Sequence, residues 1–341
     1  MKIAVIASPV SPLRPGQVGG AQAFLCDLAT GLARRGHAVR LHCVEGSEVP
    51  GVELVMVQAP VDAKAALVMP GGPAPSPAPG VGAAFEEMFK SIASDTDIIS
   101  QHAFDAPAFE LSRSLPVLHT LHLPPLVPDV KRAVARVDAA RLATVSEACR
   151  RSWSAAGVDI ARVLRNGVPD QTVDGAPIDF VALVAGRISP EKGIEHALQA
   201  ARKAGLAVRF AGAAYDPAYA VDLTGCEWLG ALPRDELRRV MARSAVTVCA
   251  VRWDEPFGLV AAEAQMAGCP VAAYRRGALP EVVEDGVSGF LAEPDDVEGL
   301  AAAISRCLAL DRLAVRSSAL RRLGMEDALD RYELALREAA R

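Results

Sequence analysis

The sequence predicts an α/β protein made of two domains, each a parallel sheet with helices on both faces. Short apolar runs alternate with amphipathic helical patterns along most of the chain, which is typical of parallel sheets with crossover helices. The 341 residues exceed what one hydrophobic core usually organises. The alternation also falls into two series, with the polar, glycine-containing stretch 170–177 between them. Two Rossmann-like domains of similar size follow from these three observations.

Each apolar run is expected to form one strand. The runs of the first series cover residues 2–7, 38–44, 52–57, 97–101, 116–119 and 141–145, and those of the second cover 179–185, 207–211, 226–229, 245–250 and 270–273. We therefore assign residues 1–168 to a first domain and residues 169–324 to a second. The amphipathic segment 325–341 is expected to be a helix that packs back on the first domain. The proline-rich segment 70–80 is predicted to be a long loop, either a lid or disordered.

Composition and charge exclude several classes of partner. The net charge of −5 gives no general attraction to nucleic acid or to an anionic membrane. A modest local basic patch is the candidate exception, formed by Arg34, Arg35, Arg40, Lys131, Arg132 and Arg136. The seven cysteines include no Cys-x-x-Cys pair, which argues against zinc and disulfides and fits a cytoplasmic protein. No run reaches the roughly 18 apolar residues of a membrane span, and the first run is too short for a secretory signal.

The most informative motif begins at Glu255 and ends at Glu263. If a helix starts near Gly258, Glu255 lies just before its N-terminus and Glu263 lies about 7.5 Å further along the axis. The unpaired amides of the first turn suit a phosphate, and the carboxylates beside them suit hydroxyl groups. The pattern therefore indicates a sugar-nucleotide site, although an ordinary capped helix fits it as well.

A second motif follows the apolar run 179–185. Arg187 and Lys192 are five residues apart across the turn from Gly186 to Gly193, so both can reach one anionic group. Arginine binds such a group bidentately and lysine acts as a compact point charge. A diphosphate needs such a pair, although a solvated charged loop is the alternative interpretation.

The first domain carries weaker signals. Gly19 and Gly20 open its first helix, where glycine lets backbone amides approach a ligand closely. Their spacing does not match the Gly-x-Gly-x-x-Gly of dinucleotide-binding folds, so a nicotinamide enzyme ranks lower. His122 follows a strand and is a candidate hydrogen-bonding group, and His102 has a similar place.

Metal binding is not expected. Asp95-Thr96-Asp97 resembles an acidic metal-binding triplet, but Asp97 directly precedes an apolar run. A helix end followed by a strand start explains the triplet better. No other carboxylate and histidine cluster has metal-ligand spacing.

Taken in order, four elements resemble the retaining nucleotide-sugar glycosyltransferases of the GT-B fold, in particular glycosyltransferase family 4. They are Gly19-Gly20-Ala21, Thr120-Leu121-His122, the Gly-Arg-x4-Lys-Gly motif ending at Gly193, and the Glu-x7-Glu motif ending at Glu263. The resemblance implies two Rossmann-like domains that face each other across a cleft. Many relatives have His-x-His near the fourth strand, whereas this chain has Ser100-Gln101-His102.

The resemblance also implies roles for individual residues. The catalytic set would be His122, Arg187, Lys192 and Glu255, with the two basic residues on the diphosphate. The donor would be bound by Gly19, Gly20, Arg187, Lys192, Leu229, Gly230, Glu255, Phe257, Gly258, Leu259 and Glu263. Glu263 would accept the ribose hydroxyls, and the base would lie near the turn formed by Trp228, Leu229 and Gly230.

The implied reaction is retaining transfer of a sugar from a nucleotide sugar, most simply a UDP- or GDP-sugar, without a metal or other cofactor. The acceptor would be a hydroxyl of a small molecule, a natural product or an oligosaccharide, and nucleic acid and membranes are not expected partners. A sugar-nucleotide epimerase or a phosphorylase of the same fold is the nearest alternative. A non-catalytic sugar-nucleotide binder is the alternative from another class.

Overall fold

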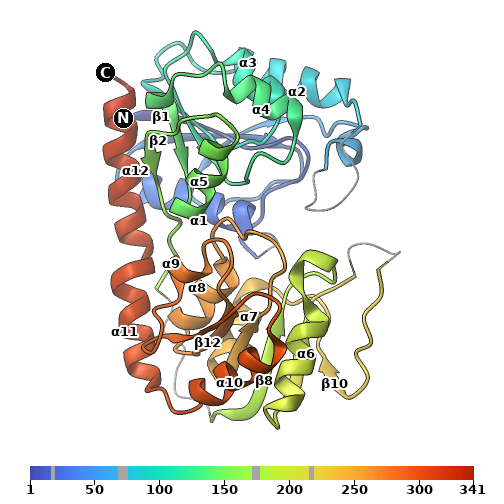
Figure 1. The fold of residues 1–341 in the computed structure, drawn as a ribbon. Coiled ribbons are helices and arrows are strands. Elements are labelled where there is room, and N and C mark those ends of the chain that lie inside the picture. The colour runs from blue at the N-terminus through green and yellow to red at the C-terminus, as the bar shows by residue number, and fades with distance from the viewer. Residues whose placement is uncertain (17–19, 68–75, 171–176, 215–218) are drawn as a thin grey trace. The chain divides into compact units, whose positions relative to one another are not determined.

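The computed structural model describes residues 1–16, 20–67, 76–170, 177–214 and 219–341. Its contacts divide the chain into two compact units, one formed by Met1–Arg165 with Glu326–Arg341 and the other by Asn166–Met325. The sequence analysis placed these breaks after residues 168 and 324. Each unit contains one parallel sheet with its helices (Figure 1). The predicted α/β class is confirmed.

The first unit contains a seven-stranded sheet in the order β3-β2-β1-β4-β5-β6-β7, and all its neighbouring strands are parallel. The strands are β1 (Lys2–Ile6), β2 (Ala38–Val44), β3 (Glu53–Val57), β4 (Ile98–Gln101), β5 (Val117–Leu121), β6 (Leu142–Thr144) and β7 (Arg162–Val163). β1 is apolar throughout its interior because it is central and covered on both faces. In one of its cores, Ile6 and Ile99 pack with Phe85 and Met88.

The helices of this unit are α1 (Gly20–Arg34), α2 (Pro79–Lys90), α3 (Ala106–Leu111), α4 (Pro128–Val134), α5 (Glu147–Ala155) and α12 (Met325–Ala339). Its 3₁₀ turns are η1 (Ala63–Ala66) and η2 (Ala139–Arg141). Residues 68–75, which include the first part of the proline-rich segment, lie outside the described residues. The expectation that the loop extends to residue 80 was wrong, because α2 begins at Pro79. Proline is tolerated in the first helical turn, where its missing N–H has no intrahelical partner.

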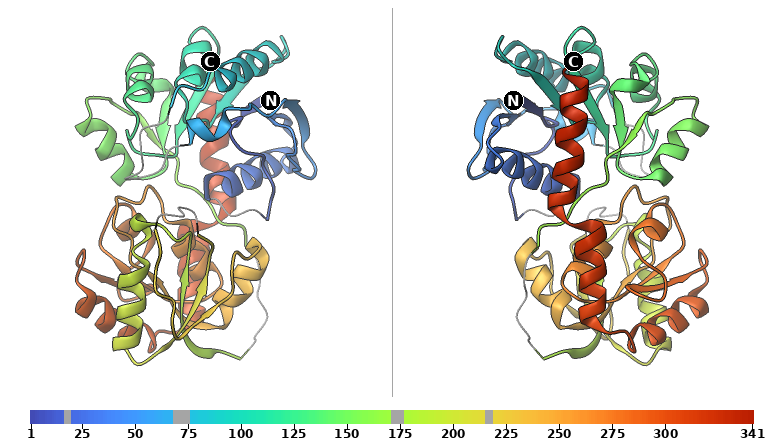
Figure 2. Two further views of the ribbon diagram at one scale, coloured as in Figure 1. Left: turned by 90° about the vertical axis from the view of Figure 1, so that its right-hand side faces the viewer. Right: turned by 90° about the vertical axis from the view of Figure 1, so that its left-hand side faces the viewer.

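The C-terminal helix α12 packs on the first unit, as predicted, and lies beside α1 (Figures 1 and 2). Its buried face carries Leu329, Tyr332 and Leu336, which repeat at helical spacing. Gly31 of α1 permits this approach, since a Cβ there would lie 2.7 Å from Leu329 Cδ1.

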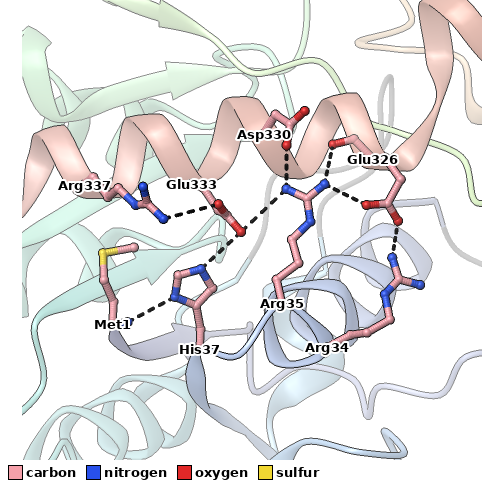
Figure 3. Close-up of polar contacts among 8 residues, drawn as sticks. All are labelled: Met1, Arg34, Arg35, His37, Glu326, Asp330, Glu333 and Arg337. Carbon is pink, nitrogen blue, oxygen red and sulfur yellow. Dashed lines mark hydrogen bonds and ion pairs between the residues drawn. The ribbon is translucent and has the colours of Figure 1, made fainter.

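Ion pairs surround that apolar face (Figure 3). Arg35 binds Glu326 at 2.7 Å and Asp330 at 2.6 Å, and Arg34 also pairs with Glu326. His37 lies 3.2 Å from Glu333. The proposed basic patch is therefore not a free cationic surface here, because its two adjacent arginines are neutralised by the C-terminal helix.

The second unit contains a six-stranded sheet in the order β10-β9-β8-β11-β12-β13, again parallel throughout. Its strands are β8 (Asp179–Ala185), β9 (Ala207–Ala211), β10 (Cys226–Trp228), β11 (Ser244–Cys249), β12 (Val271–Tyr274) and β13 (Gly289–Ala292). Its helices are η3 (Pro190–Lys192), α6 (Ile194–Lys203), α7 (Arg234–Arg243), α8 (Leu259–Met266), α9 (Leu279–Val282), α10 (Val297–Cys307) and α11 (Arg312–Leu323). Within the described ranges, no helix is long and apolar enough to cross a membrane.

Candidate functional site

The candidate site lies at the carboxyl edge of the second sheet. The chain runs from β8 to β9 and β10 on one side and then crosses to β11 on the other side of β8. Loops that leave the strands at such a switch point form the usual ligand crevice of open α/β sheets. The loops after β8 and β11 meet there, since Arg252 N donates to Glu191 O at 2.8 Å.

Gly193 sets how closely these two loops approach. Its φ is +59°, in the left-handed region, and a Cβ at this position would lie 1.9 Å from Ala250 O. Both conditions require glycine. On the other side of β8, Gly212 has a similar role, because a Cβ there would lie 1.8 Å from Gly186 O.

Lys192 and Glu255, from the two loops, form a salt bridge of 2.8 Å. The indole Nε1 of Trp253 donates to the same Glu255 oxygen at 2.9 Å, and Lys192 Nζ lies 5.8 Å from the centre of the Trp253 ring. Both charged side chains are mostly buried, with exposed fractions of 21% and 16%. The structure thus brings together two of the predicted site residues and adds Trp253, which sequence reasoning missed.

Arg187 is held by an acid in its own loop. Its Nε donates to Glu191 Oε1 at 2.9 Å, and Ser189 Oγ donates to the same oxygen at 2.7 Å. The Glu191 side chain is buried, whereas Arg187 is about one-third exposed. The spacing of four residues between Arg187 and Glu191 was a readable signal for this pair.

Glu263 has a different environment from the one expected. Helix α8 begins at Leu259 after Gly258, whose φ is +94°, so the predicted helix start is correct. The Glu263 side chain, however, is only 8% exposed and accepts hydrogen bonds from Arg234 Nε at 2.5 Å and Arg238 Nη2 at 3.3 Å.

Sequence reasoning missed both arginines. They are four residues apart on α7 and therefore lie on one helix face with the buried Met241, which was the available signal.

The remaining donor-site candidates of the second unit lie near this edge. Leu229 N donates to Phe210 O, and Gly230 O accepts from Gly212 N at 2.8 Å, so the turn after β10 joins the loop after β9. Trp228 next to it is 55% exposed. Phe257 is buried in the loop before α8. Gly20 is the first residue of α1, and Gly19 lies outside the described residues.

In the first unit, His122 is buried directly after β5. Its Nε2 lies 2.9 Å from His102 Nδ1, and Phe24 contacts its ring at a centroid distance of 6.0 Å. Burial lowers the pKa of His122 to about 4, so the imidazole is neutral at pH 7. His119 is buried within β5 and bonds Gln101 Oε1 at 3.2 Å, which is a core role.

The acidic triplet has a local structural role. Asp97 accepts from the Lys2 amide at 2.7 Å, and Asp95 forms an ion pair with the Lys2 side chain. Among the described residues there is no group of three or more histidines, cysteines or acids that could hold a metal ion. The cysteines are free thiols, mostly buried.

Two known protein families match consecutive parts of this chain. The family described as Glycosyltransferase Family 4 matches residues 18–172, and the family described as Glycosyl transferases group 1 matches residues 176–319. The chain belongs to the family 4-type glycosyltransferases. Together the two matches include the candidate site residues of both units.

Relatives of this glycosyltransferase support the assignment over part of its length. A glycogen synthase of Mycobacterium tuberculosis is 32% identical over 168 residues, which cover 43% of this chain and 39% of that protein. A D-inositol 3-phosphate glycosyltransferase of a Mycobacterium species is 38% identical over 157 residues, 42% of this chain and 36% of that protein. The chain thus spans about two fifths of the length of the curated relatives it matches.

Solved structures show the GT-B fold over nearly the whole chain. HepE of Anabaena, in complex with UDP-glucose, has a TM-score of 0.74 at 20% identity and covers 99% of this chain and 100% of its own. A glycosyltransferase involved in avilamycin A biosynthesis has a TM-score of 0.73 at 22% identity, with 99% and 98% covered.

Proposed function

We propose that this glycosyltransferase moves a sugar from a nucleotide sugar to a hydroxyl of a small-molecule, natural-product or oligosaccharide acceptor, with retention of configuration and without a metal. The observation that carries the proposal is the Lys192–Glu255 pair at the switch point of the second sheet. It places a cation for the diphosphate and an acid for sugar hydroxyls side by side. The UDP-glucose complex of HepE supports a UDP-sugar as the first donor to test.

The two basic residues would bind the diphosphate and stabilise the charge that develops on it as the glycosidic bond breaks. In the structure, Lys192 is neutralised by Glu255 and Arg187 is held by Glu191. A donor would draw Lys192 towards its phosphates and leave Glu255 to accept the sugar hydroxyls. A diphosphate oxygen would then take the proton of the attacking hydroxyl on the same face of the sugar, which gives retention.

Glu263 would bind the ribose. Both arginines of α7 donate to its Oε1, and the ribose hydroxyls would donate to Oε2. Arg234 and Arg238 thus orient the carboxylate, while the exposed Trp228 and the adjacent Leu229 and Gly230 would lie near the base. We also place the protein in the cytoplasm, since its thiols are free, and expect neither a nucleic-acid nor a membrane partner.

The first test is a thermal-shift panel of UDP-, GDP- and dTDP-sugars, because a ligand that binds the folded state stabilises it by an amount that rises with the logarithm of its affinity. One nucleotide should raise the melting temperature selectively, and transfer should require an added acceptor. Donor consumption without an acceptor would instead indicate an epimerase, and saturable binding without transfer to any acceptor would indicate a non-catalytic binder.

Two variants then test the residue roles. Lys192→Ala should lower turnover more than donor affinity. Glu263→Gln should weaken donor binding by about 1.5–3 kcal/mol, the worth of a hydrogen bond to a charged group. Glutamine is preferable to alanine because its amide oxygen can still accept hydrogen bonds from the two buried arginines, whereas alanine would leave them with neither the charge nor the acceptor of Glu263.

Lys203→Ala is the matched control, since among the described residues Lys203 forms only an exposed pair with Glu298 on the same unit. Wild-type turnover and donor affinity in Lys192→Ala and Glu263→Gln would refute the assignment of these residues.

A further inference from the structure

Three buried side chains of the first unit form a continuous chain of hydrogen bonds. Ser100 Oγ lies 2.8 Å from His102 Nε2, and His102 Nδ1 lies 2.9 Å from His122 Nε2. Ser100 is the third residue of β4, His102 directly follows that strand, and His122 follows the neighbouring strand β5. Their exposed fractions are 0%, 7% and 8%.

Aromatic rings enclose this chain. Tyr332 of α12 stacks on His102 with ring centroids 6.0 Å apart and planes 27° apart. Phe24 of α1 contacts both Tyr332 and His122. Burial lowers the pKa of both histidines far enough that each is neutral at pH 7 and carries one ring hydrogen. Which nitrogen carries it is then decided by the hydrogen bonds.

The single hydrogen of Ser100 sets the direction of the chain. Among the described residues, His102 Nε2 is the only hydrogen-bond partner of Ser100 Oγ. Either direction leaves one buried hydrogen without an acceptor, the Ser100 hydroxyl hydrogen or the His122 Nδ1 hydrogen, and each costs about 1–3 kcal/mol. Ser100 is fully buried whereas His122 is 8% exposed, so only the hydrogen on His122 can find its acceptor in a ligand. Ser100 therefore donates to His102 Nε2, His102 carries its hydrogen on Nδ1, and that hydrogen goes to His122 Nε2.

At its His122 end, this series of hydrogen bonds is left with a hydrogen and no acceptor. Since His122 Nε2 accepts from His102, the one hydrogen of the neutral ring is on Nδ1. Within the described part of the chain this buried Nδ1 has no partner. A buried donor without a partner in the protein is uncommon and points to a role in binding.

We propose that Ser100 and His102 are positioning residues that fix His122 in its Nδ1–H tautomer, so that His122 offers a neutral hydrogen-bond donor to an oxygen of the substrate. That the oxygen belongs to the sugar of the donor rests on the proposed function. The arrangement has a chemical consequence. With one nitrogen accepting and the other protonated, His122 has no site for a further proton from the acceptor hydroxyl, so it is a donor and not a general base.

The test begins with the ligand-free protein labelled with nitrogen-15 at its six histidines. Nitrogen chemical shifts distinguish protonated from unprotonated ring nitrogens, and His122→Asn assigns the His122 signals. The wild type should show a protonated Nδ1 and an unprotonated Nε2 for His122. A protonated Nε2 would overturn the proposal.

Three variants test whether the hydrogen bonds of Ser100 and His102, rather than the packing of their side chains, set the tautomer of His122. Ser100→Thr keeps the hydroxyl, and His102→Asn keeps an N–H in the place of Nδ1, so both should retain the Nδ1–H tautomer of His122. Ser100→Ala removes the hydrogen that directs the chain and should give a mixture of tautomers. An unchanged His122 tautomer in Ser100→Ala would show that Ser100 does not set it.

Binding of the nucleotide sugar provides the second measurement. Ser100→Ala should weaken affinity for the stabilising nucleotide sugar by about twofold if the two tautomers are equally populated, and by up to roughly tenfold, about the worth of one hydrogen bond, as the Nδ1–H tautomer is lost, while Ser100→Thr should stay near wild type. Equal affinities in the two variants would overturn the link to the substrate. If no sugar nucleotide binds the wild type, the proposed function fails, whereas the tautomer measurement still decides the role of Ser100 and His102.

Discussion

Gly193 fixes the positions of the basic residues in the loop before it. Its left-handed backbone and the 1.9 Å approach of a Cβ to Ala250 O mean that alanine must move one of the two loops. Gly193→Ala should destabilise the protein by roughly 2 kcal/mol or more and weaken the thermal shift given by the donor. Urea unfolding and the nucleotide-sugar panel measure the two effects.

Gly205→Ala is the matched control for that substitution. Gly205 also has a positive φ, +74°, but nothing lies within 4 Å of a Cβ built there. It should cost about 1 kcal/mol from backbone conformation alone and leave the donor response unchanged. Equal losses of stability and donor response in the two variants would show that the contact between the loops is unimportant.

The motifs on the carboxyl edge of the second sheet could be read from residue types and spacing, but their pairing could not. The sequence showed that Lys192 and Glu255 suit a phosphate and a sugar, yet only the fold shows that they bind each other. Arg234 and Arg238 were missed because a charged helix in a sequence is normally taken for a solvated face. Here both are buried against Glu263, since one carboxylate accepts hydrogen bonds from both guanidinium groups.

Among the elements, α12 depends on a polar contact as well as on its apolar face (Figure 3). Arg35 contributes most to it, because it reaches Glu326 and Asp330 and lies 3.5 Å from Glu333, with its side chain only 21% exposed. Arg35→Ala should lower the free energy of unfolding by about 1–2 kcal/mol, more than one exposed pair is worth. Urea unfolding at low and high salt measures this.

Arg40→Ala is the control for that prediction, since Arg40 forms one exposed pair with Glu53 on the same unit. It should change stability by less than about 0.5 kcal/mol. The difference between the two variants in free energy of unfolding should shrink in high salt, because screening weakens the interactions between exposed charges. A salt-independent difference would mean that Arg35 acts through packing of its aliphatic stem.

Elements with long apolar runs were predictable and short ones were not. β2, β8 and β9 have the predicted bounds because each is a run of apolar residues next to polar or glycine-containing turns. β13 was missed as a strand because its four residues begin with glycine, and β7 has only two residues. Their pairing comes from neighbouring strands rather than from local preference.

At the scale of the whole molecule, the histidines whose pKa is lowered by burial are unevenly divided between the two units. Burial lowers the pKa of His42 to about 4 and that of His119 to about 3, and the same cause acts on His102 and His122. All four belong to the first unit. Since an unfolded histidine titrates near 6.5, the unfolded unit binds more protons than the folded one between pH 6.5 and about 4, so stability falls as the pH falls through this range.

Asp105 opposes this trend in the same unit. Burial raises its pKa to about 6, so the folded unit takes up this proton before the unfolded chain does, and its effect on stability has the opposite sign between pH 6 and 3.8. One carboxyl cannot offset four imidazoles. The first unit should therefore lose stability on the order of several kcal/mol between pH 7 and pH 4.5.

Tryptophan fluorescence can follow the units separately. Trp153 is fully buried in the first unit, whereas Trp228 and Trp253 belong to the second, which contains one histidine, His196. A Trp228→Phe/Trp253→Phe variant reports the first unit, and Trp153→Phe reports the second. On acidification the thermal midpoint of the Trp153 signal should fall more steeply than that of the Trp228 and Trp253 signal. His119→Gln should reduce this difference between the midpoints, because it removes one of the four imidazoles. Parallel shifts in both signals would mean that the buried histidines do not control acid stability, because their protonation can only act on the unit that buries them.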